Sequence, residues 1–486
     1  MKLEPVIGLE IHIQLKTKSK MFCACDNTGE DKPANTTICP VCLAHPGTLP
    51  VPNAEAVHMA VKAALVLNLH INQNSKFDRK NYFYPDLPKG YQISQHHETL
   101  GRDGYLEIET KEDVRRVGIE EMHLEEDTAK FFHNSKHSLL DFNRAGTPLM
   151  EIVTKPEVKS PEEARIFLQE LKLLMRYLDI SDADMEKGHL RCDANLSLRP
   201  VGDSKFYHKT EIKNLNSFKS VEKALTYEIE RQTKLWEKGT PQTVTTTCGW
   251  NEKKGVTVVQ REKEALHDYR YFPEPDIPPL NITDVQIKAW TKELPELPQA
   301  RRKRLQEVYD LGVAESRLLT EDCVLGDFTE SVINVLTSEL EGDIKAAAKL
   351  ATNWIVHKLS AILTEKRGSI KKLSFDVDQL VEFLLLVARR QVNSTNAQLL
   401  LRKMVETGRD PDDILQTENL GQSSGAEDGL DKAVIKVLVT YPEQVEQYKA
   451  GKAALMKFFL GAVMKETKGK VDPIEAERML KQKLTL

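Results

Sequence analysis

Long apolar runs are missing from this sequence. Hydrophobic residues make up 40% of its 486 residues, but no run of them approaches the roughly 20 residues that cross a bilayer. The first residues, Met1–Pro5, are not followed by the apolar core of a signal peptide. We therefore expect a cytoplasmic protein without a membrane segment, whose cysteines stay reduced.

An excess of one charge is also missing. The chain carries 68 Lys and Arg against 73 Asp and Glu, a formal net charge of -5. Any nucleic-acid surface must then be a local patch rather than a property of the whole chain. The sequence contains neither a Walker A motif nor a dinucleotide glycine fingerprint, so a bound nucleotide would not use a P-loop.

The length exceeds what one hydrophobic core supports, so several domains are expected. Strand patterns and a few helices fill the first part of the chain, and helical periodicity dominates after Leu294. The proline-rich stretch 271–279 ends the first part. We predict an α+β fold, with a first domain over 1–292 built on an antiparallel sheet, an all-helical domain over 293–405, and a small helical tail domain over 406–486.

Individual elements are predicted where the periodicity is clearest. Strands are expected over 7–15, 115–125, 191–199 and 256–260, and helices over 52–68, 161–178 and 217–237. Ser160 is the expected N-cap of the second helix, and Pro161 occupies its first position because that position needs no backbone donor.

Four of the seven cysteines crowd into one short segment, as Cys23-Ala24-Cys25 and Cys39-Pro40-Val41-Cys42. In a reducing compartment such a cluster is more often a metal site than a pair of disulfides. Two close pairs can supply the four thiolates of a tetrahedral, structural zinc site, which would hold the loop 26–38. Four unrelated reduced cysteines remain the alternative, because the Cys-x-Cys half is the less specific one.

Polar side chains recur at every second residue in several strand-like segments. Between Leu9 and Leu15 every odd-numbered residue is aliphatic, so Glu10, His12 and Gln14 share the opposite face. Similar rows are His123 and Glu125; Arg191, Asp193, Asn195, Ser197 and Arg199; and Lys209, Glu211 and Lys213. Any one row is explained as the wet face of a half-buried sheet. Together the rows favour a site in which carboxylates hold Mg2+ and nearby basic residues neutralise phosphate.

Two further segments have the composition of nucleotide or nucleic-acid contacts. Residues 77–92 combine five aromatic with three basic side chains, which suits stacking on a base or sugar, although such loops also cap cores. The last 56 residues, 431–486, hold eleven Lys and Arg against seven Asp and Glu, an excess of +4. This basic tail fits a phosphate backbone as well as it fits a solvated helix face.

Longer motifs carry a family resemblance. Besides the run 6–15 and both cysteine pairs, they lie at 80–92, 123–127, 141–149, 191–195, 211–217 and 269–276. In this order they resemble the B subunit of the glutamine-dependent aspartyl/glutamyl-tRNA(Asn/Gln) amidotransferases, and they cover residues 6–280 densely. The helical remainder matches more loosely, although 448–452 and 464–470 resemble the tail of the family.

The resemblance implies a catalytic cradle similar in fold to glutamine synthetase, followed by a helical domain and a tail. It implies a ligase with two steps: ATP phosphorylates the side-chain carboxylate of Glu-tRNA(Gln), Asp-tRNA(Asn) or both, and ammonia then displaces phosphate to leave the amide. Ammonia would come from an amidase (glutaminase) A subunit, with a small C subunit completing a heterotrimer. Nothing in this chain resembles an amidase nucleophile motif, which agrees with a glutaminase on another chain.

The resemblance also implies roles for individual residues. The catalytic group that holds Mg2+ would be Glu10, His12, Glu125 and Glu211, with Asp193 as a further acid. Contacts to ATP or to the substrate would come from Tyr82, Tyr84, Lys89, Arg191 and Lys213. Contacts to tRNA phosphates would come from Lys449, Lys452, Lys465, Lys468 and Lys470.

One departure from the family pattern lies outside these motifs. Thr247-Cys248 stands where relatives usually have Thr-Arg, and Gln260-Arg261 stands where they usually have Met-Arg. If the missing arginine touches substrate or a neighbouring strand, that contact is lost or supplied from elsewhere. Two other functions remain open: a tRNA-binding scaffold without phosphotransfer, and a metal-dependent hydrolase that uses the same acidic rows.

Overall fold

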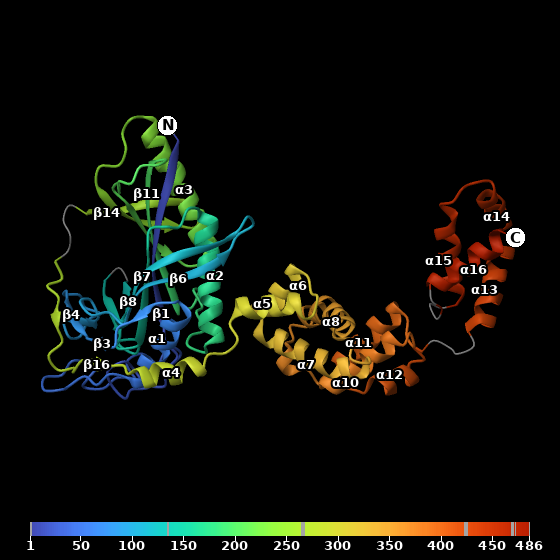
Figure 1. Cartoon of the computed structure of the whole chain (residues 1–486), viewed down its shortest axis with the longest axis horizontal. Helices are drawn as coiled ribbons and strands as arrows, with labels where there is room; N and C mark the ends of the chain where they lie inside the picture. The colour runs from blue at the N-terminus through green and yellow to red at the C-terminus, as the bar shows by residue number, and fades with distance from the viewer. Residues whose placement is uncertain are drawn as a thin grey trace. The chain divides into compact units, whose positions relative to one another are not determined.

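The computed structural model describes residues 2–133, 136–263, 268–421, 426–467, 471 and 473–485. It divides into two compact units, Met1–Leu297 and Pro298–Leu486 (Figure 1). The first unit contains all the strands among the described residues, and the second is helical. The predicted α+β fold followed by helical regions is therefore confirmed, whereas the boundaries predicted after residues 292 and 405 stay a prediction.

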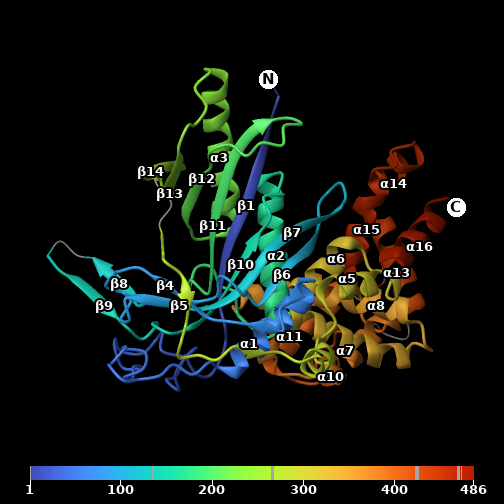
Figure 2. The same ribbon diagram turned by 60° about the vertical axis from the view of Figure 1, so that its left-hand side comes forward.

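A nine-stranded sheet forms the centre of the first unit (Figure 2). In spatial order its strands are β14 (Val256–Lys263), β13 (Thr245–Asn251), β12 (Thr210–Leu215), β11 (Leu190–Pro200), β1 (Leu3–Gln14), β10 (Pro148–Thr154), β7 (Val114–Glu126), β6 (Gly101–Glu109) and β2 (His70–Ile71). The sheet is mixed rather than wholly antiparallel as predicted, because β12 and β13 run parallel. A helix connects those two strands, and such a crossover makes the parallel pairing possible.

Helices cover one face of this sheet. They are α1 (Ala54–Val66), α2 (Pro161–Tyr177) and α3 (Phe218–Glu237), and Figures 1 and 2 show α2 and α3 along the same side. The aliphatic residues of β1, such as Ile11, pack with helix residues such as Phe167 and Val221 in one hydrophobic cluster. The polar side chains of the same strands consequently face away from the helices.

The helix starts follow their sequence signals. Ser160 caps α2 by accepting a hydrogen bond from the Glu163 N–H at 3.1 Å, with Pro161 at the first position, as predicted. Ser217 caps α3 in the same way. Each cap satisfies a backbone donor that the first turn leaves without a partner. The capping residue therefore determines where each helix begins.

Three small sheets complete the strands of the first unit. They are formed by β4 (Asp78–Asn81), β5 (Tyr91–Ser94) and β15 (Phe272–Pro273); by β3 (Asn74–Ser75) and β16 (Leu280–Asn281); and by β8 (Lys130–His133) and β9 (Ser138–Asp141). The proline-rich stretch is thus partly regular: β15 is an edge strand against β4, a position that tolerates proline. Helix α4 (Asp284–Lys292) then packs on α1.

The second unit consists of helices around two hydrophobic clusters. The first cluster involves α5 (Pro298–Glu307), α6 (Val313–Glu321), α7 (Cys323–Glu339), α8 (Ile344–Thr352), a π-helical segment (Asn353–Leu359), α9 (Ser360–Glu365), α10 (Val377–Ala388), α11 (Ser394–Thr407) and α12 (Pro411–Thr417). The second involves α13 (Ala426–Thr440), α14 (Pro442–Lys449), α15 (Leu455–Glu466) and α16 (Pro473–Thr485). None of the helices in the described ranges is long and apolar enough to span a membrane.

The burial pattern of β7 predicts unequal effects of two identical substitutions. Val117 is 1% exposed and Val114 is 62% exposed. Val117→Ala should lower the free energy of unfolding by about 1.5–3 kcal/mol, because it removes buried methyl groups. Val114→Ala, the matched control, should change it by no more than about 0.5 kcal/mol. Chemical denaturation of both variants measures the difference, and equal shifts would contradict this assignment of faces.

Candidate active site

A row of charged side chains crosses the polar face of the sheet. The strand register places Arg191 opposite His12, His12 opposite Glu151, and Glu151 opposite His123. Glu125 follows two residues after His123 and so shares its face. Since neighbouring strands lie about 4.8 Å apart, four strands bring these groups together from distant parts of the sequence.

Two imidazoles and two carboxylates of this row make direct contacts, and we call them the His–Glu cluster (His12, His123, Glu125 and Glu151). The Nε2 atom of His12 lies 3.5 Å from a Glu125 oxygen and 3.4 Å from a Glu151 oxygen. The Nε2 atom of His123 lies 3.1 Å from Glu151 and 3.7 Å from Glu125. Ligand atoms of His12, Glu125 and Glu151 all lie within 4.8 Å of one another, so one cation could contact all three.

The charges in the His–Glu cluster depend on one another. Burial disfavours charge on both imidazoles, but the carboxylates of Glu151 and Glu125 outweigh it, raising the pKa of His12 above its ordinary value and that of His123 to about 10. Burial likewise opposes charge on Glu151, but the two imidazoles hold the pKa of Glu151 well below its usual range. A divalent cation would compete with the imidazole protons for the same carboxylates.

Glu151 is the member of this cluster that the sequence reading missed. It lies in β10, directly after the motif 141–149, between Met150 and Ile152, which are fully buried. The sequence does contain a signal for Glu151, because it is an acidic residue between two apolar ones in a strand. Such a residue must lie on the polar face of the sheet. His123 was placed on the polar face from its row but was given no role.

The predicted residues Glu10, Asp193 and Glu211 form a separate group, in which Asp193 and Glu211 contact Lys213. The Lys213 ammonium lies 2.5 Å from an Asp193 oxygen and 2.9 Å from a Glu211 oxygen. Burial opposes its charge, but both carboxylates raise the pKa of Lys213. Glu10 pairs with Asp193 across the β1–β11 ladder and accepts a hydrogen bond from the Asn195 amide at 2.8 Å. The side chain of Lys213 is therefore a positive charge held between two carboxylates.

The four residues predicted to hold one ion therefore share a face, but only two of them lie in one cluster. His12 and Glu125 meet in the His–Glu cluster, together with Glu151. Glu10 lies two residues along β1 from His12, and Glu211 lies on β12, with β11 between it and β1. Within the described part of the chain, the ligand set that forms around His12 takes Glu151 where the prediction had Glu10 and Glu211.

Arg191 ends the charged row on β11 and is held by Asp127. Its Nη2 atom donates to Asp127 at 2.7 Å, and Gln14 donates to the same oxygen at 3.1 Å. Burial opposes charge on Asp127, but Arg191 and Arg144 outweigh it and lower the pKa of that carboxyl. The Nε atom of Arg191 is buried without a partner among the described residues, so the guanidinium keeps a donor for a ligand.

Lys89 lies apart from both acidic groups. Its ammonium contacts Glu126 at 2.6 Å, and the side chain of Glu126 points to the opposite side of β7 from Glu125. Lys89 and Glu126 line a cavity together with Cys23 and Cys42. The structure therefore places this lysine beside the cysteines.

A different lysine approaches the His–Glu cluster. Lys80 of β4 is half-buried; desolvation disfavours its charge, but the carboxylates of Glu125 and Glu151 and two tyrosines raise its pKa. Its ammonium also lies 5.1 Å from the ring centroid of Tyr269. Of the two predicted tyrosines, Tyr82 packs on Tyr269 with ring centroids 6.0 Å apart, whereas Tyr84 is 51% exposed. The aromatic loop therefore contributes Lys80 and Tyr82 to this side of the sheet.

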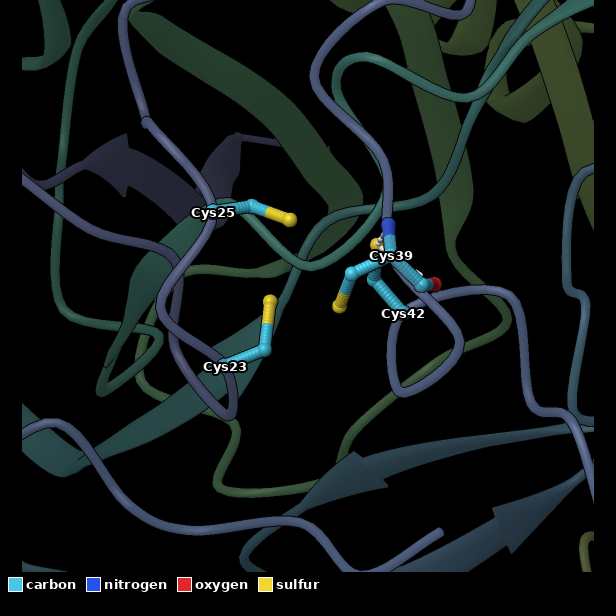
Figure 3. Close-up of side chains that lie close together, drawn as sticks. All are labelled: Cys23, Cys25, Cys39 and Cys42. Carbon is cyan, nitrogen blue, oxygen red and sulfur yellow. Dashed lines mark hydrogen bonds between the residues drawn. The ribbon is translucent and has the colours of Figure 1, made fainter.

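The four clustered cysteines converge from two loop segments, as Figure 3 shows. Their sulfur atoms all lie within 4.8 Å of one another, close to the edge of about 3.8 Å that four Zn–S bonds of 2.3 Å would give. The hydrogen bond with Cys23 lowers the pKa of Cys42 to about 5, against the effect of burial and with help from Lys20. Burial raises the pKa of Cys25 to about 11. The geometry suits a closed four-thiolate site.

Cys248, the departure from the family pattern, lies away from the acidic groups. Its neighbour Thr247 donates to Glu211 at 3.0 Å, so Cys248 points to the opposite side of β13, toward α3, and is 1% exposed. There Arg231 donates two hydrogen bonds to the carboxylate of Glu228, at 2.6 and 2.9 Å. An arginine at this position would face the helix, so the substitution leaves the site residues untouched. The side chain of Arg261 lies outside the described residues.

The predicted tRNA contacts lie in the last helices. Lys449, Lys452 and Lys465 are exposed, and Lys452 donates to Gln447 at 3.1 Å. Lys468 and Lys470 lie outside the described residues. The exposed lysines are available to a phosphate backbone.

Comparison with known proteins identifies relatives over the whole chain. Residues 5–288 match the GatB/GatE catalytic domain, and residues 338–484 match the GatB domain. A protein of Thermomicrobium roseum is 46% identical over 100% of this chain and 99% of its own length. Proteins of Crocosphaera subtropica (44%; 97% of this chain, 95% of its own) and Persephonella marina (43%; 100% of both) are similar as well. All three carry the name of the B subunit of an aspartyl/glutamyl-tRNA(Asn/Gln) amidotransferase.

The Glu228–Arg231 pair beneath Cys248 predicts a pH-dependent contribution to stability. Burial raises the pKa of Glu228, but the hydrogen bonds from Arg231 and Gln232 outweigh it, so the folded-state pKa lies below the ordinary value. Glu228→Gln should cost about 1.5–3 kcal/mol of unfolding free energy at pH 7. The difference from wild type should shrink as the pH falls below about 4.3, through the folded pKa. Glu237→Gln, on the exposed side of α3, is the matched control, and a pH-independent loss would contradict the assignment.

Proposed function

The chain belongs to the family of aspartyl/glutamyl-tRNA(Asn/Gln) amidotransferase B subunits, and we propose how its first unit carries out the reaction. The enzyme converts misacylated Glu-tRNA(Gln), Asp-tRNA(Asn) or both to the amide. In our proposal ATP first phosphorylates the free side-chain carboxylate of the aminoacyl group. Ammonia then displaces phosphate.

Chemical reactivity accounts for this order. A carboxylate is a poor electrophile because its carbonyl carbon carries two electron-rich oxygens. One carboxylate oxygen attacks the γ-phosphorus and ADP leaves, which gives a mixed anhydride with a good leaving group. Ammonia attacks the carbonyl carbon, phosphate departs, and the nitrogen loses a proton to give the amide. The protein contributes position and charge to both steps.

The observation that carries the proposal is the His–Glu cluster. Two carboxylates and an imidazole offer ligand atoms within 4.8 Å of one another on a polar sheet face. Glu125 is 2% exposed, and a buried carboxylate needs cationic partners, which His12 and His123 supply. Oxygen ligands that leave room for phosphate are what Mg2+ requires. These residues therefore fit the ion, which when bound would neutralise charge on the phosphates.

The surrounding basic residues have distinct tasks. Arg191, fixed on Asp127 but with an unused Nε donor, can hold a phosphate or the substrate carboxylate. Lys213 keeps Asp193 and Glu211 at fixed positions and presents positive charge to phosphate. Lys80 supplies positive charge beside Glu125 and Glu151, and Lys89 remains a proposed contact to ATP or to the substrate. Glu10, Asp193 and Glu211 then remain as acids for a second cation position along the same face.

Two parts of the enzyme lie outside this chain in our proposal. Ammonia comes from a partner amidase A subunit, and a small C subunit completes a heterotrimer. The second unit of the present chain carries the basic tail, where Lys449, Lys452 and Lys465 are exposed to tRNA phosphates. Tyr82, beside Tyr269, is placed to stack on the nucleotide or on the 3′ end of the tRNA.

We further propose that the four cysteines hold a structural Zn2+. Four sulfurs fill all positions of a tetrahedral ion and leave none for water. The Lys20 ammonium, 3.9 Å from the Cys42 sulfur, offsets part of the negative charge of four thiolates. The loop 26–38 has no helix or strand of its own, so the ion would fix it.

Removing a carboxylate or an imidazole from the His–Glu cluster should strongly reduce phosphorylation. In the heterotrimer, Glu151→Gln and His12→Ala should each lower ATP-dependent amide formation by at least about 100-fold, with glutaminase activity retained. Glu112→Gln, in an exposed turn, is the control. Full amide formation by both cluster variants would support a tRNA-binding scaffold, and turnover of a small substrate without ATP would support a hydrolase.

Metal analysis tests the cysteine site. The purified protein should contain about one zinc per chain, and Cys39→Ser should lose it together with thermal stability, because metal binding and folding of the loop are coupled. Cys323→Ser, a cysteine of the second unit, should keep the zinc. Equal zinc contents in both variants would rule out this site.

The tail is tested by its dependence on salt. Replacing Lys449, Lys452 and Lys465 with alanine should raise the KM for tRNA and reduce the slope of log affinity against log salt by about 1 for each lost phosphate contact. The KM for ATP should not change. A control triple variant at Lys345, Lys371 and Lys372 should behave as wild type. An unchanged KM for tRNA would place the tRNA contact elsewhere.

A further inference from the structure

Strand β7 loses its partner on one side just before it reaches the His–Glu cluster. Its ladder with β6 ends at Gly101 and Met122, and Glu125 follows three residues later. Residues 92–95, from β5 and the residue after it, contact β7 beyond this point. Because β5 belongs to a different sheet, these residues do not continue the ladder of β7.

The segment 92–95 is attached to β7 through side chains. Gln92 donates to the Glu126 carbonyl at 2.7 Å, and the Leu124 N–H donates to Gln95 at 3.0 Å. The Ile93 N–H donates to the Glu126 carboxylate at 3.0 Å. Buried backbone groups need such partners, so these three hydrogen bonds fix the position of the segment along β7.

Ser94 lies between these attachment points and reaches the His–Glu cluster itself. Its hydroxyl donates to the Oε2 atom of Glu125 at 3.3 Å. Both residues are 2% exposed, so water has little access with which to replace the hydroxyl. A buried carboxylate oxygen without a donor costs free energy, and Ser94 supplies that donor.

The two oxygens of Glu125 consequently have different surroundings. Oε2 lies beside Ser94 and 3.7 Å from the Nε2 atom of His123, which is 7% exposed. Oε1 lies 3.5 Å from the Nε2 atom of His12, whose side chain is 25% exposed. One oxygen is therefore held inside the protein by a neutral donor, and the other is directed to the accessible side of the cluster.

We propose that Ser94 is a positioning residue that makes Glu125 a one-oxygen ligand and thereby favours Mg2+ over larger cations, an inference that rests on the function proposed above. Mg2+ requires octahedral coordination and keeps positions for water and phosphate, whereas Ca2+ often takes both oxygens of one carboxylate. A hydroxyl that donates to Oε2 opposes this second contact. Ser94 acts through Glu125 rather than on the substrate.

A purely structural role is the competing explanation for Ser94. Without its hydroxyl, the segment would still be attached by the three hydrogen bonds of Gln92, Ile93 and Gln95. A looser segment would weaken the binding of all cations alike, because Glu125 would be less well ordered for each of them. A change in the preference between two cations therefore separates the two explanations.

Binding of metal ions to the heterotrimer tests the proposal without turnover. Mg2+ and Ca2+ are each titrated against bound Mn2+, whose electron paramagnetic resonance signal reports its displacement. Ser94→Ala should lower the ratio of Mg2+ to Ca2+ affinity about fivefold or more and leave the glutaminase rate unchanged. Ser220→Ala is the matched control, because it removes a buried serine hydroxyl that donates to another carboxylate, that of Glu252, at 2.8 Å.

Two further variants show whether the serine acts through Glu125. Ser94→Thr keeps the hydroxyl and should retain the cation preference of the wild type. In the Glu125→Gln background, which lacks the carboxylate, addition of Ser94→Ala should leave the ratio of the two affinities unchanged. In amide formation, Ser94→Ala should raise the Mg2+ concentration that gives half of the maximal rate.

Contrary results are distinct for the inference and for the proposed function. Equal losses of Mg2+ and Ca2+ affinity in Ser94→Ala would assign the serine a structural role, and an unchanged ratio would show that it does not restrict Glu125. In both cases Glu151→Gln would still lower ATP-dependent amide formation, and the proposed function would stand. Full amide formation by Glu151→Gln would instead overturn the proposed function together with this inference.

Discussion

The alternation of side chains along β1 is the constraint on which the site depends. Ile7, Leu9, Ile11 and Ile13 are at most 1% exposed under the helices. Burying that face leaves Glu10 and His12 no position except the polar face. A slip of one residue in register would bury both of these polar side chains and expose the aliphatic row. Burial of the aliphatic row therefore stabilises the fold and, at the same time, the positions of the site residues.

Charge balance is organised differently in the two acidic groups of this face. In the His–Glu cluster, carboxylates alternate with imidazoles, whose protons a cation can replace. Around Lys213, two carboxylates share one ammonium, which a cation cannot displace without moving the side chain. This difference explains why a metal is expected first at His12, Glu125 and Glu151. The second group, whose acids Lys213 neutralises only in part, is the position at which we propose a second cation.

The two units of the chain carry different kinds of candidate functional residue. The first unit contains the acidic groups and the cysteines, on or around one sheet. The second unit consists of helices with exposed lysines near its end. In our proposal the first unit binds the reacting carboxylate and the exposed lysines of the second unit contact the tRNA, because most of the binding surface of a large tRNA lies far from that carboxylate.

The sequence alone determined which elements form and which residues face the solvent side of the sheet. Strand period, helix caps and cysteine spacing act over a few residues, so β1, β7, β11, α2 and the convergence of Cys23, Cys25, Cys39 and Cys42 followed from them. The resemblance of the longer motifs to a known family predicted the activity. Only the tertiary structure decided which rows became neighbours, because strand order and register depend on packing across the whole unit. That packing brought Glu151 to His12, left Glu211 beyond β11, turned Cys248 toward α3, and brought Ser94 to Glu125.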